Sequence, residues 1–260
     1  MSSWASIITV ALLALALGGC GAFGDKPDIT RDWPVQRLYS EAKAALDGGD
    51  YETAIDYYEK LESRYPFGRY AQQAQIDLAY AYWKDEENAS AIAAADRFIK
   101  LHPRHPSVDY AYYLKGLVNF EQGKSFTDRI LPRDMSQRDP GAVRQAFDDF
   151  SALVQRFPDS RYAADARQRM LYLKNLLARH EIHVADYYMR RGAYVAAANR
   201  ARFVVENFQR TPVVPDALVI MAKAYRLMDL DDLSDDTLRV LRLNYPEHAG
   251  VAEVESIKSN

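Results

Sequence analysis

One pattern of apolar and small positions recurs along most of the chain. Four apolar, helix-like runs end in an aromatic residue or His followed by Pro: Tyr65-Pro66, His102-Pro103, Phe157-Pro158 and Tyr245-Pro246. Phe208-Gln209 fits the same position without the proline. Proline cannot continue a helical hydrogen-bond ladder, so each of these points predicts the end of a helix.

Two further positions agree in all five copies. Twelve residues before the proline position the residue is always small: Ala54, Ala91, Ala146, Ala197 and Ser234. Five residues before it the residue is always apolar: Leu61, Phe98, Leu153, Val204 and Leu241. Agreement at two offsets predicts an internally repeated fold, in which the small residue allows two helices to cross closely.

The repeating unit resembles the tetratricopeptide repeat. The segment Gly49-Asp50-Tyr51-Glu52-Thr53-Ala54-Ile55 is similar to the turn and second-helix start of that repeat, and residues 192–197 echo it. The resemblance implies antiparallel pairs of helices, A and B, stacked into a solenoid in which each repeat buries its face on its neighbours.

The spacing of the repeats predicts two insertions. Successive proline positions are 37, 55, 51 and 37 residues apart, as the sequence shows. The first insertion, 121–140, contains Gly123, Pro132 and Pro140 and predicts a loop. The second lies in a stretch without Pro or Gly between Ser160 and Arg191. The 51-residue spacing exceeds the 37-residue one by fourteen residues, which is close to four helical turns. Inserting whole turns keeps the buried face in phase, so this stretch predicts an extended helix over 160–191.

These patterns predict an all-α fold, a tetratricopeptide-repeat solenoid of five helix pairs and about ten helices. The pairs occupy 34–66, 69–103, 106–158, 160–209 and 213–246 within a scaffold over 34–246. Residues 20–33 are expected to be a tether and residues 247–260 a flexible tail. No segment alternates apolar and polar residues as a half-buried strand does, so no sheet is expected.

The first nineteen residues have a different character. Ile7 to Leu17 is apolar apart from Thr9, which is too short for a membrane-spanning helix and typical of a signal peptide over 1–19. Leu17-Gly18-Gly19-Cys20 resembles the bacterial lipobox, and Cys20 is the sole cysteine. The resemblance implies lipidation of Cys20 by a diacylglycerol and an N-acyl chain such as palmitate, and Gly21 implies sorting to the outer membrane. The usual basic residues before the apolar run are missing.

Charge and chemistry narrow the function. A formal net charge of −3 argues against nucleic-acid binding. His180 and His183 stand one helical turn apart, but the metal-binding H-E-x-x-H pattern is absent, and surface histidines are the preferred interpretation. No phosphate-binding loop or nucleophile elbow occurs. We therefore expect no catalytic residues, no metal site, no cofactor besides the acyl chains, and no enzyme activity.

Eighteen tyrosines need an explanation. Tetratricopeptide helices use aromatic residues in their cores, which is the first interpretation for each tyrosine. Tyr80-Ala81-Tyr82-Trp83 and Tyr110-Ala111-Tyr112-Tyr113 nevertheless place aromatic rings on several sides of a helix. Some of them are expected to face outward, where tyrosine is enriched at interaction sites and could line a groove for an extended peptide.

Local motifs point to one family of scaffolds. They are Arg64-Tyr65-Pro66-Phe67-Gly68, Asp96-Arg97-Phe98-Ile99, His105-Pro106, Asp109-Tyr110, Arg138-Asp139-Pro140, Ala146-Phe147-Asp148-Asp149-Phe150, Val184-Ala185-Asp186-Tyr187-Tyr188 and Asn199-Arg200. Together they resemble the BamD family, lipoproteins of the outer-membrane β-barrel assembly machinery (BAM complex). The resemblance extends from Cys20 to about residue 246 and includes both insertions.

This resemblance implies location, partners and sites. Such a protein faces the periplasm from the outer membrane and binds the POTRA-domain outer-membrane barrel protein, companion lipoproteins and unfolded outer-membrane proteins as clients. By matching positions, Tyr65, Phe67 and Tyr70 are expected at the client-peptide site, and Arg191, Asn199 and Arg200 at the barrel-subunit interface. The alternatives are a repeat lipoprotein that coordinates peptidoglycan synthesis or cell division, and a periplasmic enzyme or metal binder that uses the histidines.

Overall fold

The computed structural model describes residues 28–122, 136 and 139–257. The predicted signal peptide, Cys20, the first part of the tether and most of the 121–140 loop lie outside the described residues. Within the described part of the chain the regular elements are eleven α-helices without a strand, which confirms the all-α prediction. They are α2 (Val35–Gly48), α3 (Tyr51–Arg64), α4 (Arg69–Lys84), α5 (Asn88–Leu101), α6 (Val108–Gln122), α8 (Gly141–Arg156), α9 (Ala163–Arg190), α10 (Tyr194–Asn207), α11 (Val214–Arg226), α12 (Asp231–Asn244) and α13 (Gly250–Glu255).

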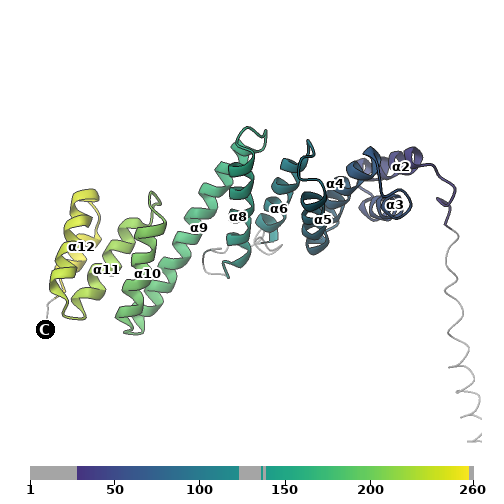
Figure 1. Cartoon of the computed structure of the whole chain (residues 1–260). Helices are drawn as coiled ribbons and strands as arrows, with labels where there is room; N and C mark the ends of the chain where they lie inside the picture. Colours follow the sequence, from purple (N-terminus) through teal and green to yellow (C-terminus); the bar gives the residue numbers. More distant parts are fainter. Residues whose placement is uncertain (1–27, 123–135, 137–138, 258–260) are drawn as a thin grey trace, which may run out of the picture.

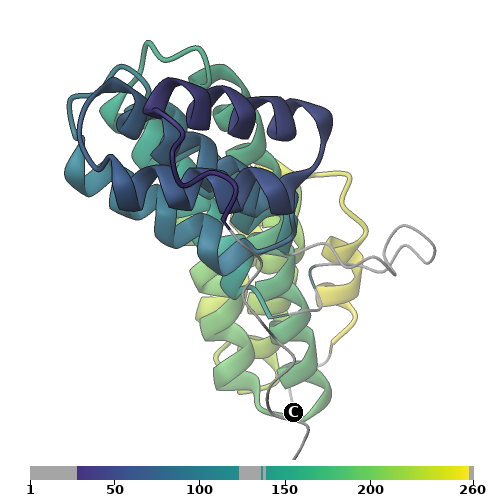
Figure 2. The same ribbon diagram turned by 90° about the vertical axis from the view of Figure 1, so that its right-hand side faces the viewer.

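The helices stack as pairs along one elongated solenoid (Figure 1). The A helices are α2, α4, α6, α9 and α11, and each packs on the B helix that follows it. A helices also meet across repeats, α2 with α4, α4 with α6 and α9 with α11, so they share one side of the stack. Figure 2 shows the first pairs running across the last ones, so the stack turns along its length.

The repeated positions form the core. All five small residues and all five apolar residues at the two offsets have no solvent exposure. Where the apolar run ends, Tyr65, His102, Phe157, Phe208 and Tyr245 all leave the helical conformation, and each backbone N–H still bonds the carbonyl four residues earlier. The proline that follows four of them has no N–H to extend the ladder, so every B helix ends at the same point.

Helix α9 joins the first three repeats to the last two. It is 28 residues long, which accommodates the second insertion as helix. Ala166 and Leu173 in its first half pack in a cluster with α8, whereas Ala178 and Ile182 in its second half pack in a cluster with α10. One continuous helix therefore carries two successive repeat interfaces, and its rigidity sets how the two halves of the scaffold are arranged.

The structure differs from the expected flexible tail over 247–260. Residues 250–255 form α13, which packs on α11 and α12 and buries Val254 completely. Lys223 and Glu253 form an ion pair across the contact. The physical reason is that the last A helix, α11, has no following repeat to cover its apolar face, and α13 covers it.

Gly116 of α6 allows the closest approach within the third repeat. A Cβ atom at this position would lie 2.5 Å from Cε1 of Phe150, whose side chain is fully buried in α8. The ring belongs to the core cluster that α6, α8 and α9 form, so moving it would disturb this packing. The packing of α6 on α8 therefore requires glycine here, despite its poor helix propensity.

We predict that Gly116→Ala lowers the free energy of unfolding by about 1–2 kcal/mol, because overpacking outweighs the gain in helix propensity. The measurement is urea denaturation followed by circular dichroism. Gly48→Ala is the matched control, since a Cβ there meets nothing within 4 Å. Equal or greater stability of Gly116→Ala than of the wild type would contradict the packing argument.

Candidate protein-binding surfaces

The predicted barrel-interface residues lie at the end of α9 and along α10, the helix that packs on it. Arg191 stands at the C-terminal cap of α9, and Asn199 and Arg200 lie on α10. All three are exposed. Arg200 donates from Nη1 to Oε2 of Glu181 on α9 at 3.0 Å. The Glu181 side chain is 6% exposed and that of Arg200 is 47% exposed, so the guanidinium is anchored on one side and open on the other.

Two apolar side chains that the sequence did not single out belong to this surface. Val195 and Phe203 are exposed and share a stripe of α10 with Asn199, because four-residue spacing keeps side chains on one helix face. Phe203 is held edge-on against Phe208, with ring centroids 5.7 Å apart. The surface (Arg191, Val195, Asn199, Arg200 and Phe203, called here the α10 surface) combines apolar contacts with arginine, as protein interfaces do.

A comparison of repeats could have found Phe203. It stands six residues before the proline position, where the first two repeats carry the charged residues Lys60 and Arg97. The last repeat departs further from this polar pattern. Three exposed apolar side chains lie on α12: Leu233, Val240 and Leu243. The positions that match Leu233 and Leu243 carry mostly polar residues in the earlier repeats. Exposed apolar side chains are therefore concentrated in the C-terminal half, which favours contacts with other proteins there.

The predicted client residues are not gathered into one pocket. Tyr65 is half-buried, and its Oη donates to the carbonyl oxygen of Trp33 at 3.0 Å. Tyr70 is half-buried and faces Tyr39 of α2, with ring centroids 5.4 Å apart. Phe67, in the turn between α3 and α4, is 89% exposed. The three rings thus lie in three different environments at the same end of the molecule.

A partly buried polar cluster includes Tyr39. Asp77 of α4 accepts hydrogen bonds from Oη of Tyr39 at 2.9 Å, Oη of Tyr58 at 3.4 Å and Nε2 of Gln73 at 2.9 Å. Burial raises the pKa of the Asp77 carboxyl, against the lowering effect of these hydrogen bonds. Burial and the Asp77 carboxylate also raise the pKa of Tyr39 and Tyr58. The cluster ties α2, α3 and α4 together.

Aromatic contacts continue along the A-helix side. Tyr162 stacks on Tyr113, with centroids 4.7 Å apart, and contacts Tyr110 at 5.4 Å. Tyr113 donates from Oη to Asp165 at 2.6 Å, and burial followed by this hydrogen bond raises its pKa to about 12. Most of these rings are partly buried, so they combine the core and surface roles that were considered for the tyrosines.

A cleft of about 410 Å³ lies between the turn that joins α5 to α6 and the turn that joins α8 to α9. Val108 and Phe157 form apolar parts of its lining, and Arg104, His105 and Arg156 are among its basic residues. Burial and the neighbouring His102 lower the pKa of His105. The side chain of His105 is therefore uncharged at neutral pH, and the two arginines supply the positive charge of the cleft.

His180 of α9 has a structural contact. His180 contacts the carbonyl oxygen of Ser136 through Nδ1 at 2.7 Å, which links the inserted segment to α9. Among the described residues, no group of three His, Cys, Asp or Glu side chains is placed to hold a metal ion. None of the described helices is both long and apolar enough to cross a membrane.

Comparison with known proteins gives consistent matches. A family model described as YfiO, outer membrane lipoprotein, matches residues 31–241. The chain is 49% identical to the outer membrane protein assembly factor BamD of Neisseria meningitidis serogroup B, over 93% of this chain and 91% of that protein. It is 42% identical to the protein of the same name from Vibrio cholerae, over 90% of this chain and 96% of that protein.

Solved structures are more distant. The MamA protein is 17% identical with a TM-score of 0.33, over 83% of this chain and 96% of that chain. A putative kinesin light chain from Podosopora anserina with TPR-like repeats is 15% identical with a TM-score of 0.35, over 82% of this chain and 97% of that chain. Because both scores are low, the family is established by the sequence relatives.

We predict that Asp77→Asn changes how stability depends on pH. The folded-state pKa of Asp77 is raised, so its contribution to stability is complete below the unfolded pKa of about 3.9 and is lost as pH rises through the folded value. The asparagine cannot ionise, and its amide can bond Gln73 after a flip of that side chain. Between about pH 4 and pH 7, the free energy of unfolding of Asp77→Asn should therefore rise relative to wild type.

The measurement is urea denaturation of both proteins at several pH values across that window. Their difference removes the contribution of the other carboxyl groups. A difference that stays constant or falls with pH would show that Asp77 is not destabilised by its burial.

Proposed function

The chain belongs to the BamD family of outer membrane protein assembly factors, and from this membership we propose that it is a non-enzymatic scaffold lipoprotein of the machinery that inserts β-barrels into the outer membrane. It is anchored by acyl chains on Cys20 and faces the periplasm. Its C-terminal repeats bind the POTRA-bearing barrel subunit and its N-terminal repeats receive unfolded barrel proteins. Companion lipoproteins complete the assembly. The observation that carries this proposal is the 49% identity to an assembly factor over 93% of the chain.

The α10 surface supports the contact with the barrel subunit. Its apolar side chains, Val195 and Phe203, flank Asn199 and leave a surface that another protein could cover. The Arg200 guanidinium has five N–H donors in a fixed fork, of which the hydrogen bond to Glu181 uses one. The remaining donors can bind a carboxylate or backbone oxygens of a partner, and Glu181 keeps the side chain positioned before binding.

The A-helix side of the first two repeats supports the reception of clients. Tyr70 and Tyr39 come from neighbouring A helices, and both rings are half-buried. A client's aromatic side chain could pack on this pair, since aromatic rings prefer such tilted contacts. Of the three predicted client residues, Tyr70 has this geometry, whereas Tyr65 holds the segment around Trp33.

We predict that Arg200→Ala weakens binding of the POTRA domains by about 5- to 30-fold, or roughly 1–2 kcal/mol, because it removes a positioned donor and leaves Glu181 without this partner. Isothermal titration calorimetry with the purified POTRA domains measures the change.

Arg97→Ala is the matched control for this prediction. Arg97 donates to Glu62 at 2.6 Å across two helices of the N-terminal half, and its side chain is 51% exposed, much as that of Arg200 is. It should leave the affinity within about twofold of wild type. Unchanged affinity of Arg200→Ala would remove Arg200 from the interface, and an equal loss in both variants would indicate a general structural effect.

We predict that Tyr70→Leu weakens binding of a client peptide with a C-terminal aromatic residue by about 2- to 10-fold, the size of one aromatic pair. Leucine preserves bulk against Tyr39 and removes the ring. Fluorescence anisotropy of a labelled peptide gives the affinity. Tyr172→Leu, an exposed tyrosine on α9, serves as the control. Equal affinities for both variants would place the client site elsewhere.

A further inference from the structure

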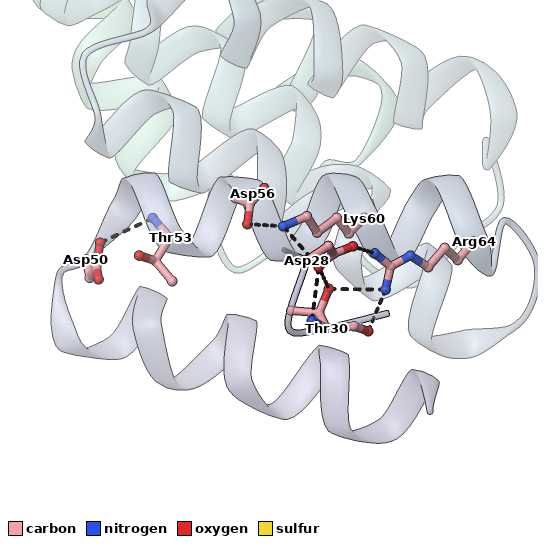
Figure 3. A network of polar contacts seen from close by, with 7 residues as sticks. All are labelled: Asp28, Thr30, Asp50, Thr53, Asp56, Lys60 and Arg64. Atoms are coloured by element: carbon pink, nitrogen blue, oxygen red, sulfur yellow. Dashed lines mark hydrogen bonds and ion pairs between the residues drawn. The ribbon is translucent and has the colours of Figure 1, made fainter. Parts of the chain in front are cut away.

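The segment that leads from the N-terminus into the scaffold is fastened to α3 (Figure 3). Arg64 donates from Nη1 to the carbonyl oxygen of Thr30 at 2.6 Å and to its Oγ1 at 3.1 Å, and it forms an ion pair with Asp28. Nζ of Lys60 lies 3.6 Å from the Asp28 carboxylate. Thr30 has no solvent exposure. We call this group the clamp.

Contacts continue from the clamp to the start of α2. The Trp33 ring packs edge-on against Tyr57 at 5.6 Å, and the Arg37 guanidinium lies 4.4 Å from the Trp33 ring. Hydrogen bonds from Thr30, with Lys60 and Arg64 nearby, lower the pKa of Asp28 to about 2. The clamp is therefore ionised at neutral pH. Residues 28–33 are held at the end of repeat 1 where α2 begins and α3 ends.

Two of the most exposed large apolar side chains in the described residues lie at this end. Ile29 is 73% exposed and sits within the clamp segment, and Phe67 is 89% exposed and follows Arg64 by three residues. Exposed arginines stand close to them in the chain, since Arg31 follows Ile29 by two residues, Arg69 follows Phe67 by two, and Arg37 lies against Trp33. Asp32 is an exposed acid here, while Asp28 is paired. The surface is thus apolar with a net positive rim, a combination that suits an interface with anionic headgroups.

The length of chain before the clamp limits where this end can be. Cys20 precedes Asp28 by eight residues, which span at most about 28 Å when fully extended. If Cys20 is acylated and its chains are in the bilayer, the clamp end stays within this distance of the membrane surface. Even a weak contact is then favoured, because tethering makes it intramolecular.

We propose that Ile29 and Phe67 insert into the headgroup region of the membrane that holds the acylated Cys20, so that repeat 1 is seated on the bilayer. This inference rests on the proposed lipid anchor. Because the clamp joins residues 28–30 to α3, it fixes the position of α3 relative to the anchor. The helices that stack on α3 are then held as well. Repeat 1 is then held at the membrane, and α10 lies in the opposite half of the solenoid (Figure 1).

The test uses the full lipidated protein in vesicles of phosphatidylethanolamine and phosphatidylglycerol. Since Cys20 is the sole cysteine and is blocked by acylation, Ile29→Cys or Phe67→Cys introduces one free thiol for an environment-sensitive fluorophore. Leu171→Cys and Leu243→Cys are matched controls, because both side chains are exposed leucines and lie on α9 and α12, in the last two repeats. The measurement is quenching by nitroxide-labelled phospholipid.

Quenching of labels at 29 and 67 by roughly half, with little at 171 and 243, is the expected result, because interfacial burial is only about 5–10 Å deep. No quenching at 29 and 67 in protein that floats with the vesicles would overturn the membrane contact while keeping the anchor. Protein that does not float would reject the anchor itself. Quenching at all four positions would mean that the scaffold lies flat on the membrane, which overturns the proposal. A signal at 67 that responds only to added client peptide would assign Phe67 to client binding, which also overturns it.

Discussion

The close crossing of two helices at a small residue is the constraint on which the whole scaffold depends. In every repeat this position is Ala or Ser and is fully buried, and an apolar side chain seven residues later is buried with it. A larger residue at the crossing would separate the pair and remove the contacts that also support the next repeat. Since each repeat is stable only on its neighbours, five local crossings produce one continuous core. Gly116 repeats the same requirement at the contact between α6 and Phe150.

Continuity of packing also explains how two distant surfaces belong to one molecule. The clamp end of repeat 1 and the α10 surface lie in opposite halves of the stack (Figure 1). They are connected through helix pairs and through α9, which packs on α8 with its first half and on α10 with its second. Because α9 is a single uninterrupted helix, the two halves are not joined by a flexible linker. A scaffold of this kind can hold partners at defined separations, which suits an assembly factor.

Polar groups inside the stack have mainly positioning roles. Glu181 is buried and orients the exposed Arg200, and Asp77 joins three helices through two tyrosines and a glutamine. Asp28 and Thr30 attach the N-terminal segment to α3. The least accessible of these groups, Glu181, Asp77 and Thr30, are stable only when their hydrogen bonds are made, so they also specify a unique arrangement of the helices. The same physics thus links the anchor segment, the aromatic A-helix side and the α10 surface.

The sequence by itself determined the all-α class, the five repeats, the position of the core and the family, because a repeated offset records a helix crossing directly. It also grouped Arg191, Asn199 and Arg200, which are close in the chain. Only the tertiary structure decided that Val195 and Phe203 share their surface, that Tyr65 binds the backbone of Trp33, and that Asp28 pairs with Arg64. It also replaced the expected flexible tail by α13. These features depend on contacts between segments far apart in the chain, or on which face of a helix its neighbours leave uncovered, and local pattern does not encode either.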